Sequence, residues 1–110
     1  MINWDQVAQL REDVGADAFE EVVELFLDEV DQVTERLTDF GALVPLQEDL
    51  HFLKGSALNL GFAVFGERCQ ACERMAAGGQ SDDVPVTDLV ECYRLSRRIF
   101  LDGIAKRDVA

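Results

Sequence analysis

The sequence predicts an all-α protein, an antiparallel up-down four-helix bundle with a short additional helix at its N-terminus. Apolar residues recur at helical spacing through most of the chain, and no segment alternates apolar and polar residues as a half-buried strand would. Gly or Pro stands between the periodic segments, where helices end or begin. Because 110 residues suffice for one core, we expect a single domain over residues 1–110.

The first element is a short helix between Asn3 and Gly15. Asn3 and Gln6 have the spacing of a helix-capping pair, and glycine often follows the last turn of a helix. The apolar residues of this segment are helically spaced: Trp4, Val7, Leu10 and Val14. We expect this helix to lie across one end of the bundle.

A long amphipathic helix follows and is expected to end at Gly41. Asp17 and Glu20 repeat the capping spacing. The apolar stripe comprises Phe19, Val22, Val23, Phe26, Val30, Val33, Leu37 and Phe40. The opposite face carries Glu21, Glu24, Asp28, Asp31 and Glu35. Because these acidic residues are spread along a helix and no calcium-loop motif is present, they indicate a solvated face.

Two further helices are predicted between Pro45 and Gly79. Pro45 suits the first turn of a helix that Gly61 ends. Its apolar face comprises Leu46, Leu50, Leu53, Ala57 and Leu60. The next helix stops at Gly78, and its stripe comprises Phe65, Cys69, Cys72 and Ala76.

The last predicted helix follows a loop through Ser81 and Asp83 and begins after Pro85. Its stripe comprises Val86, Leu89, Val90, Tyr93, Phe100 and Ile104. The pattern is less regular because Arg97 lies in this stripe and Leu95 lies outside it. Four long amphipathic helices with short connections pack most simply as a bundle.

Composition narrows the classes of partner. A formal net charge of −12 repels phosphate backbones and anionic lipid, so we expect neither nucleic acid nor membrane as a partner. The apolar runs are too short for a membrane span and the N-terminus lacks the pattern of a signal peptide, which predicts a cytoplasmic protein. Three cysteines in such a chain are expected to be free thiols.

The only histidine, His51, is the main candidate for chemistry. At 100° per residue it lies about 140° from Leu46, so its imidazole should point away from the core. Lys54 and Gly55 lie one turn further along the same surface. Glycine inside a helix costs about 1 kcal/mol relative to alanine, which favours a need for bare space beside the imidazole. Close helix packing at Gly55 is the alternative.

Other residues near His51 are candidates for partner binding. Gln47 lies one turn before the histidine, and Leu58 with Phe62 continues the exposed stripe as an apolar docking patch. Cys69 and Cys72 form a C-x-x-C, but they lie on a core stripe without a second pair, which indicates buried small residues rather than a metal site. We therefore predict no metal ligands.

The run from His51 to Gly61, His-Phe-Leu-Lys-Gly-Ser-Ala-Leu-Asn-Leu-Gly, resembles the signature of histidine-containing phosphotransfer (HPt) domains. The signature continues with a cysteine and a glutamate on the next helix, matched by Cys69 and Glu73. Two positions depart mildly from it: Leu50 stands where many members have a small residue, and Phe52 where many have a hydroxyl residue. These departures bear on partner choice.

The resemblance implies a four-helix bundle and a phosphorelay intermediate. His51 would accept a phosphoryl group from the aspartate of a receiver domain, such as that of a hybrid sensor histidine kinase, and pass it to another receiver. Mg²⁺ would belong to the receiver, and this chain would need no cofactor. Lys54 would pair with the phosphoryl oxygens, Gly55 would give clearance, and Gln47 could hydrogen-bond the ring or the phosphoryl group.

No Gly-rich phosphate loop is present, so autokinase activity is not expected. We expect a monomeric phosphoprotein of a two-component system. The alternative is a helical adaptor that binds a response regulator without chemistry. A phosphatase or metal enzyme would need convergent ligands or an acid–base pair, which one histidine and scattered carboxylates do not offer.

Overall fold

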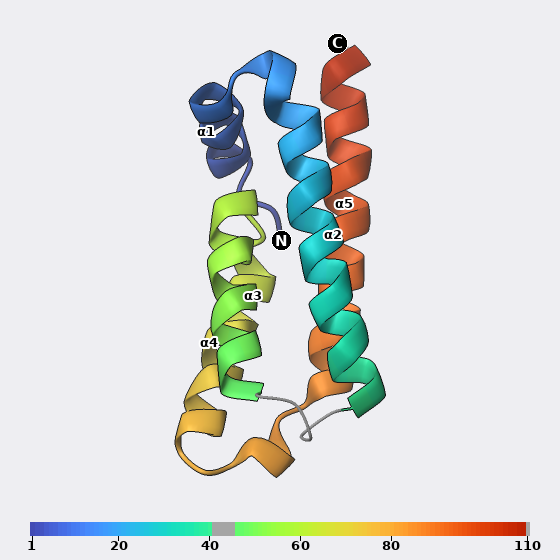
Figure 1. Cartoon of the computed structure of the whole chain (residues 1–110). Coiled ribbons are helices and arrows are strands. Elements are labelled where there is room, and N and C mark those ends of the chain that lie inside the picture. The colour runs from blue at the N-terminus through green and yellow to red at the C-terminus, as the bar shows by residue number, and fades with distance from the viewer. Residues whose placement is uncertain (41–45, 110) are drawn as a thin grey trace.

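The computed structural model describes residues 1–40 and 46–109, and these residues confirm the all-α prediction. The helices are α1 (Trp4–Val14), α2 (Ala16–Phe40), α3 (Leu46–Leu60), α4 (Ala63–Ala77) and α5 (Val86–Val109), with a 3₁₀ turn, η2 (Ser81–Asp83), before α5. Figure 1 shows α2 and α4 running in one direction and α3 and α5 in the other. The predicted helix end at Gly41 and the predicted helix start at Pro45 lie outside the described residues.

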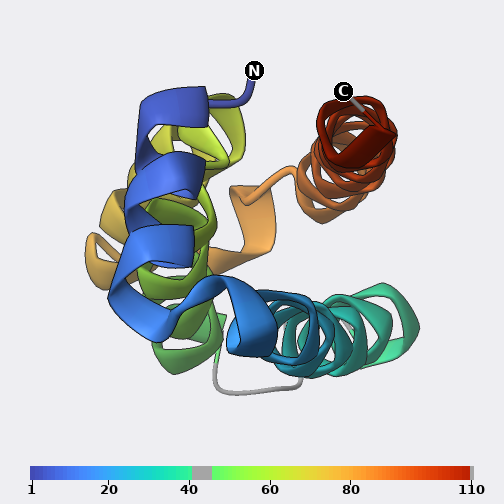
Figure 2. The same ribbon diagram turned by 90° about the horizontal axis from the view of Figure 1, so that it is seen from above.

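The helices form a ring in which α3 packs on α2 and α4, and α5 packs on α4 and α2. Seen from above, α3 and α4 lie on one side and α2 and α5 on the other, with α1 crossing the end (Figure 2). Helix α1 packs against α2 and α3, as expected for a helix across one end of the bundle. None of the described helices combines the length and apolar content that a membrane span requires.

The start of α1 is capped as predicted, but that of α2 is not. The Asn3 side chain accepts a hydrogen bond from the Gln6 amide at 3.2 Å. Asp17, predicted as the second cap, lies inside the first turn of α2. Gly15, with φ +87°, separates the two helices, and its carbonyl accepts a hydrogen bond from Ala18. Glycine adopts this backbone conformation without strain, so the chain turns over a single residue.

The core is built from the predicted stripes, with a few additions. In α3 every predicted apolar residue is buried: Leu46, Leu50, Leu53, Ala57 and Leu60. Leu27, Cys92 and Ser96 are also buried although the sequence pattern did not single them out. Asp31, predicted on the solvated face of α2, instead accepts a hydrogen bond from the Tyr93 hydroxyl at 2.6 Å. Arg97 interrupts the stripe of α5 because it also reaches Asp31, at 3.3 Å.

The turn between α3 and α4 sets the register of these two helices. Gly61 has φ +78°, and its carbonyl accepts a hydrogen bond from the Asn3 amide at 2.7 Å. A side chain at this glycine would lie only 2.6 Å from the Asn3 carbonyl oxygen. A side-chain carbon at Gly66 would lie 3.4 Å from Cβ of Ala57, an ordinary contact distance, so α4 packs against α3 here. From this contact, about two turns back along α3 and two turns forward along α4 lead to His51 and Glu73.

A second tie holds α3 beside the candidate histidine. The Arg36 guanidinium of α2 donates to both carboxylate oxygens of Asp49, at 2.6 and 3.3 Å. Asp49 is buried, and a buried carboxylate requires such a charge-assisted partner. Because Asp49 lies two residues before His51, this pair fixes the first turns of α3 on the bundle.

Candidate functional site

His51 points outward from α3, as predicted, with 71% of its side chain exposed. Its Nδ1 lies 2.8 Å from Oε2 of Glu73 on α4. Among the described residues, the other ring nitrogen, Nε2, has no hydrogen-bond partner. The ring is therefore held at one edge by α4 while the other edge faces solvent.

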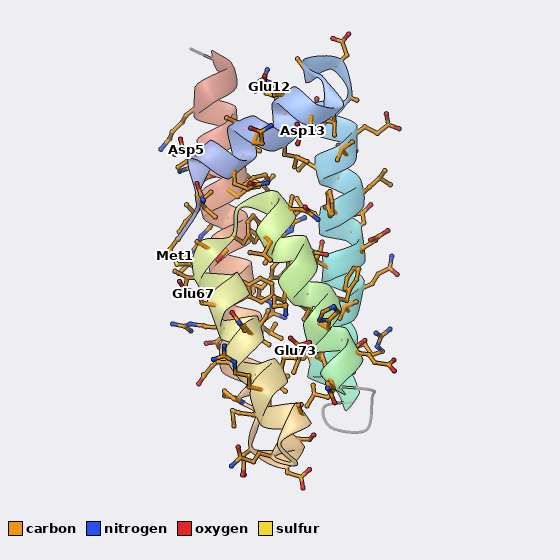
Figure 3. The ribbon with its side chains drawn as sticks, turned by 90° about the vertical axis from the view of Figure 1, so that its left-hand side faces the viewer. Met1, Asp5, Glu12, Asp13, Glu67 and Glu73 are labelled. Atoms are coloured by element: carbon orange, nitrogen blue, oxygen red, sulfur yellow. The ribbon has the colours of Figure 1, made fainter. Side chains whose placement is uncertain are left out.

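Glu73 is the residue that organises the site. Its second oxygen, Oε1, accepts a hydrogen bond from the Lys54 ammonium at 2.9 Å, so one carboxylate joins two residues of α3. Figure 3 shows Glu73 on the side of the bundle that α3 and α4 form. The hydrogen bond from Lys54 is the main cause that lowers the pKa of Glu73. The hydrogen bond from His51 also lowers this pKa. Burial raises it, but the effect of burial is smaller than that of the two partners together.

Lys54 lies beside His51 but is already engaged. A quarter of its side chain is exposed, and its ammonium forms an ion pair with Glu73. An ammonium has three donors, so one bond to Glu73 leaves donors for a second anion. The structure thus brings His51, Lys54 and Glu73 into one cluster.

Gly55 lies next to this cluster in open space. A side-chain carbon built at this glycine meets no described atom within 4 Å outside its own helix. The alternative that Gly55 permits close helix packing is therefore wrong. The bare surface instead leaves room beside the imidazole.

The three predicted partner-binding residues have different positions. Gln47 is exposed in the first turn of α3, and Leu58 is 63% exposed. Phe62, predicted in the same docking patch, is only 1% exposed and packs against Tyr93 and Phe100. That prediction is wrong because α3 ends at Leu60, and the turn at Gly61 sends the next residue into the core.

The cysteines are buried, as the sequence predicted. Cys69 and Cys72 line the inner side of α4, and burial is the main cause that raises the pKa of each thiol. Within residues 1–40 and 46–109, no group of three or more His, Cys, Asp or Glu side chains is placed to hold a metal ion. The described cysteines therefore serve as core residues.

Sequence reasoning noted Glu73 only as a match to a family pattern and gave it no role. Helical spacing reveals neighbours on one helix, whereas the contact between Glu73 and His51 depends on how α3 and α4 are paired. The only signal was the glutamate in the signature itself. The structure adds Glu73 to the candidate site because its carboxylate contacts both His51 and Lys54.

One comparison with known proteins gives the family of this chain. No curated protein matched the chain, and no solved structure did. The family model of the Hpt domain matches residues 21–98, which include all of α3 and α4. Hpt domains are phosphocarriers with a histidine phosphotransfer role in two-component signalling, and their partners are response-regulator receiver domains. Since the match covers most of its length, this chain belongs to the Hpt domain family.

Proposed function

We propose that His51 carries a phosphoryl group that it accepts from the aspartate of one receiver domain and passes to another. The observation that supports this best is the exposed imidazole whose Nδ1 is held by Glu73. A ring fixed at one nitrogen and open at the other is suited to repeated attack on, and release of, a group brought by a partner.

The hydrogen bond to Glu73 selects Nε2 as the nucleophilic atom. The lowered pKa of Glu73 keeps its carboxylate ionised at neutral pH, and an ionised carboxylate only accepts hydrogen bonds. Nδ1 therefore keeps its proton and donates a hydrogen bond to Glu73, and in the neutral ring Nε2 holds the lone pair.

In the transfer step, the Nε2 lone pair forms a bond to phosphorus. The bond between phosphorus and the aspartyl oxygen breaks, and its electron pair returns to the receiver as a carboxylate. The Nδ1 proton stays in place, so the ring becomes positively charged as the N–P bond forms. The Glu73 carboxylate, 2.8 Å from Nδ1, stabilises that charge. Transfer to the second receiver reverses these changes.

Lys54 supports the phosphoryl group in this proposal. Its ammonium lies one turn from His51 and keeps donors free while it bonds Glu73. A cation there reduces the repulsion between a phosphoryl dianion and a protein of net charge −12. The bare surface at Gly55 leaves space for the receiver's phosphorylated aspartate.

The receiver is proposed to dock on the surface around Lys54. A hollow of about 290 Å³ adjoins that lysine, and exposed Leu58 and Gln70 help to line it. Gln47, on the other side of His51, extends the same outer surface of α3. We propose the chain as a monomeric single domain that relays the group without autokinase activity or a cofactor, with Mg²⁺ bound by the receiver.

The decisive experiment uses receiver domains from the source organism, each phosphorylated with labelled acetyl phosphate and Mg²⁺ and then mixed with this protein. We expect acid-labile label on the wild type and none on His51→Gln. A His51→Gln variant that still binds the same receiver shows that docking is intact. If wild type binds a receiver but never takes label, the protein is a helical adaptor and the proposal fails.

A further inference from the structure

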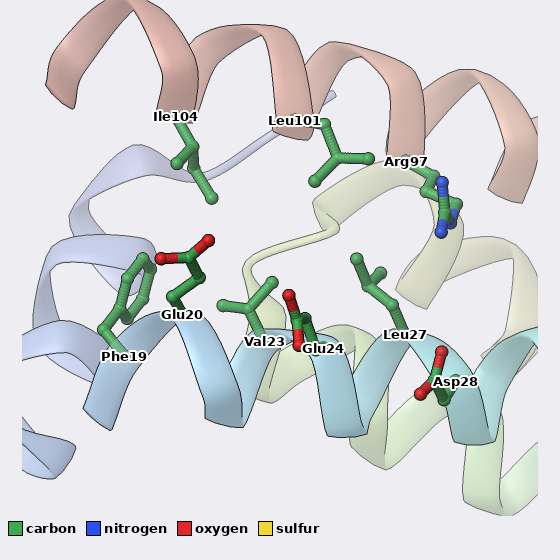
Figure 4. Close-up of a pocket in the computed structure, with 9 residues that line it drawn as sticks. All are labelled: Phe19, Glu20, Val23, Glu24, Leu27, Asp28, Arg97, Leu101 and Ile104. Carbon is green, nitrogen blue, oxygen red and sulfur yellow. The ribbon is translucent and has the colours of Figure 1, made fainter. Parts of the chain in front are cut away.

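A groove opens between α2 and α5 (Figure 4). These two helices lie across the bundle from the α3–α4 pair that carries His51 (Figure 2). Its volume is about 320 Å³. Val23 and Leu27 of α2 form its apolar floor, and Leu101 and Ile104 of α5 point toward them from the opposite wall. Leu101 is 37% exposed although it is apolar.

The groove exists because α5 is held by different partners along its length. Near its middle, the Tyr93 hydroxyl donates a hydrogen bond to Asp31 of α2, and Arg97 forms an ion pair with the same carboxylate. Further along, Phe100 stacks on the Trp4 ring at 6.2 Å between centroids, and a side chain at Gly103 would overlap that ring. The C-terminal half of α5 is therefore packed on Trp4, and the space between it and α2 stays open.

The rim of the groove on α2 is acidic. Glu20, Glu24 and Asp28 recur every four residues, so they form a row with one carboxylate per turn. All three are exposed, and none has a salt bridge with the other described side chains. Arg97 at one end of the groove is paired with Asp31, so its charge does not neutralise the row.

The geometry points to an amphipathic helix of a partner protein as the occupant, with one apolar row in the groove and one row of Lys or Arg against α2. Two helices that flank a groove with an apolar floor are a common receptor for a third helix. Basic residues at i, i+4 and i+8 would match the carboxylates turn by turn. A second copy would bring its own acidic row and its own net charge of −12, which disfavours self-association here.

This binding site is independent of the proposed phosphotransfer. The groove uses α2 and α5, whereas His51 and Glu73 lie on α3 and α4. A partner helix bound in the groove would leave the imidazole open to a receiver. The site would therefore tether the protein to a partner while receivers exchange at the opposite side.

The test uses two synthetic amphipathic helical peptides with the same leucine row, one with a Lys row and one with a Glu row. Titration is followed by calorimetry and by amide chemical shifts. We expect the Lys peptide to bind and to shift residues of α2 and α5, and the Glu peptide not to bind. Failure of the Lys peptide to bind, or shifts centred on α3 and α4, overturns the proposal.

Charge-matched variants separate the groove from the overall negative charge. The double variant Glu24→Lys and Asp28→Lys should weaken binding of the Lys peptide by about tenfold or more, because attraction becomes repulsion at the rim. The control Glu21→Lys with Glu29→Lys makes the same change of net charge on exposed residues outside the groove, and should weaken it by less than about threefold. An equal loss of affinity in the two double variants would contradict a specific site.

A second pair of matched variants tests the apolar wall of the groove. Leu101→Glu places a charge in the groove, whereas Leu95→Glu alters a similarly exposed leucine of α5 outside it. We expect loss of binding only for Leu101→Glu, with both variants equally folded by circular dichroism. If sedimentation instead shows a dimer that Leu101→Glu disrupts and Leu95→Glu does not, the occupant is a second copy and the proposal is wrong.

Discussion

Two carboxylates in this bundle make the same kind of bridge and have different consequences. Glu73 of α4 contacts His51 and Lys54 of α3, at 2.8 and 2.9 Å. Asp31 of α2 contacts Tyr93 and Arg97 of α5, at 2.6 and 3.3 Å. In each case one carboxylate meets two groups that lie one turn apart on the neighbouring helix.

The two bridges differ in the exposure of the group that they hold. The Tyr93 side chain belongs to the buried core, and burial, with the hydrogen bond to Asp31, raises the pKa of its hydroxyl. Its proton therefore stays in place, and the bridge joins two helices. The His51 ring is largely exposed, so the same type of bond leaves one nitrogen available to a partner. Burial of the bridged group separates a structural contact from a candidate site.

The largest expected difference between the bridges concerns transfer. Glu73→Ala removes a charge-assisted hydrogen bond from the ring, a type of bond worth about 1.5–3 kcal/mol. If that stabilisation applies in the transition state, the initial rate of transfer from a phosphorylated receiver falls about 10- to 100-fold. Asp31→Ala should leave the rate within about twofold, since Asp31 contacts α5 only.

Rapid-quench measurement of both variants checks this prediction. Equal rates for Glu73→Ala and the wild type would mean that the bridge to His51 has no role in transfer. An equal slowing in both variants would point to a general loss of structure, which circular dichroism and urea unfolding would detect.

The second bridge should show its effect in stability. Tyr93→Phe removes the hydroxyl that donates to Asp31, and we expect a loss of about 1 kcal/mol in the free energy of unfolding. The loss stays near the lower end for such bonds because Asp31 is 40% exposed and water replaces the lost donor. Urea unfolding measures the change, and the transfer rate should match that of the wild type. A slowed transfer would mean that the two sides of the bundle are coupled.

Most of the fold was predictable from the sequence because helical periodicity depends on local spacing. The five leucine and alanine positions of α3 were predicted and are buried, and Asn3 caps α1 as its spacing indicated. Periodicity failed where a turn changes direction. Phe62 follows the left-handed Gly61, so extension of the α3 stripe assigned it to the surface although it lies in the core.

The candidate site was predictable in part for the same reason. His51, Lys54 and Gly55 lie on one helix, and their common face follows from their numbering. Glu73 comes from the next helix, and its distance to His51 depends on the α3–α4 turn and on the packing of Gly66 beside Ala57. Asp31 shows the same limit, since its acidic neighbours on α2 are exposed and its own partner lies on α5.

A smaller effect is expected at Gly55, where two substitutions test whether transfer needs the open space beside His51. Gly55→Ala should raise the free energy of unfolding by about 0.5–1 kcal/mol, because alanine favours the helix and the added carbon meets open space. Gly55→Gln keeps the helix but fills the space beside His51, so it should slow transfer while Gly55→Ala changes it little. Urea unfolding and transfer rates of the two variants give the comparison. Unimpaired transfer in Gly55→Gln would remove clearance from the proposed role.

The smallest effects are opposite dependences on pH. A lowered pKa at Glu73 means that its bridge stabilises the fold above about pH 4.5, the usual value, and that this contribution disappears as the pH falls through the lower value in the folded protein. The difference in unfolding free energy between wild type and Glu73→Gln should therefore shrink only at acid pH.

The raised pKa of Tyr93 gives its contribution to stability the opposite dependence on pH. Its contribution is fully present below pH 10, the usual value, and decreases as the pH rises above it, since the unfolded chain then releases a proton that the folded protein keeps. The difference between wild type and Tyr93→Phe should therefore be constant through neutral pH and shrink only in alkali. Paired urea titrations of each variant across pH test both bridges, because the many other carboxylates cancel in each difference. If the Glu73 difference were instead constant down to pH 3, the carboxylate would not be held by Lys54 and His51 in solution, and the choice of Nε2 as nucleophile would lose its support.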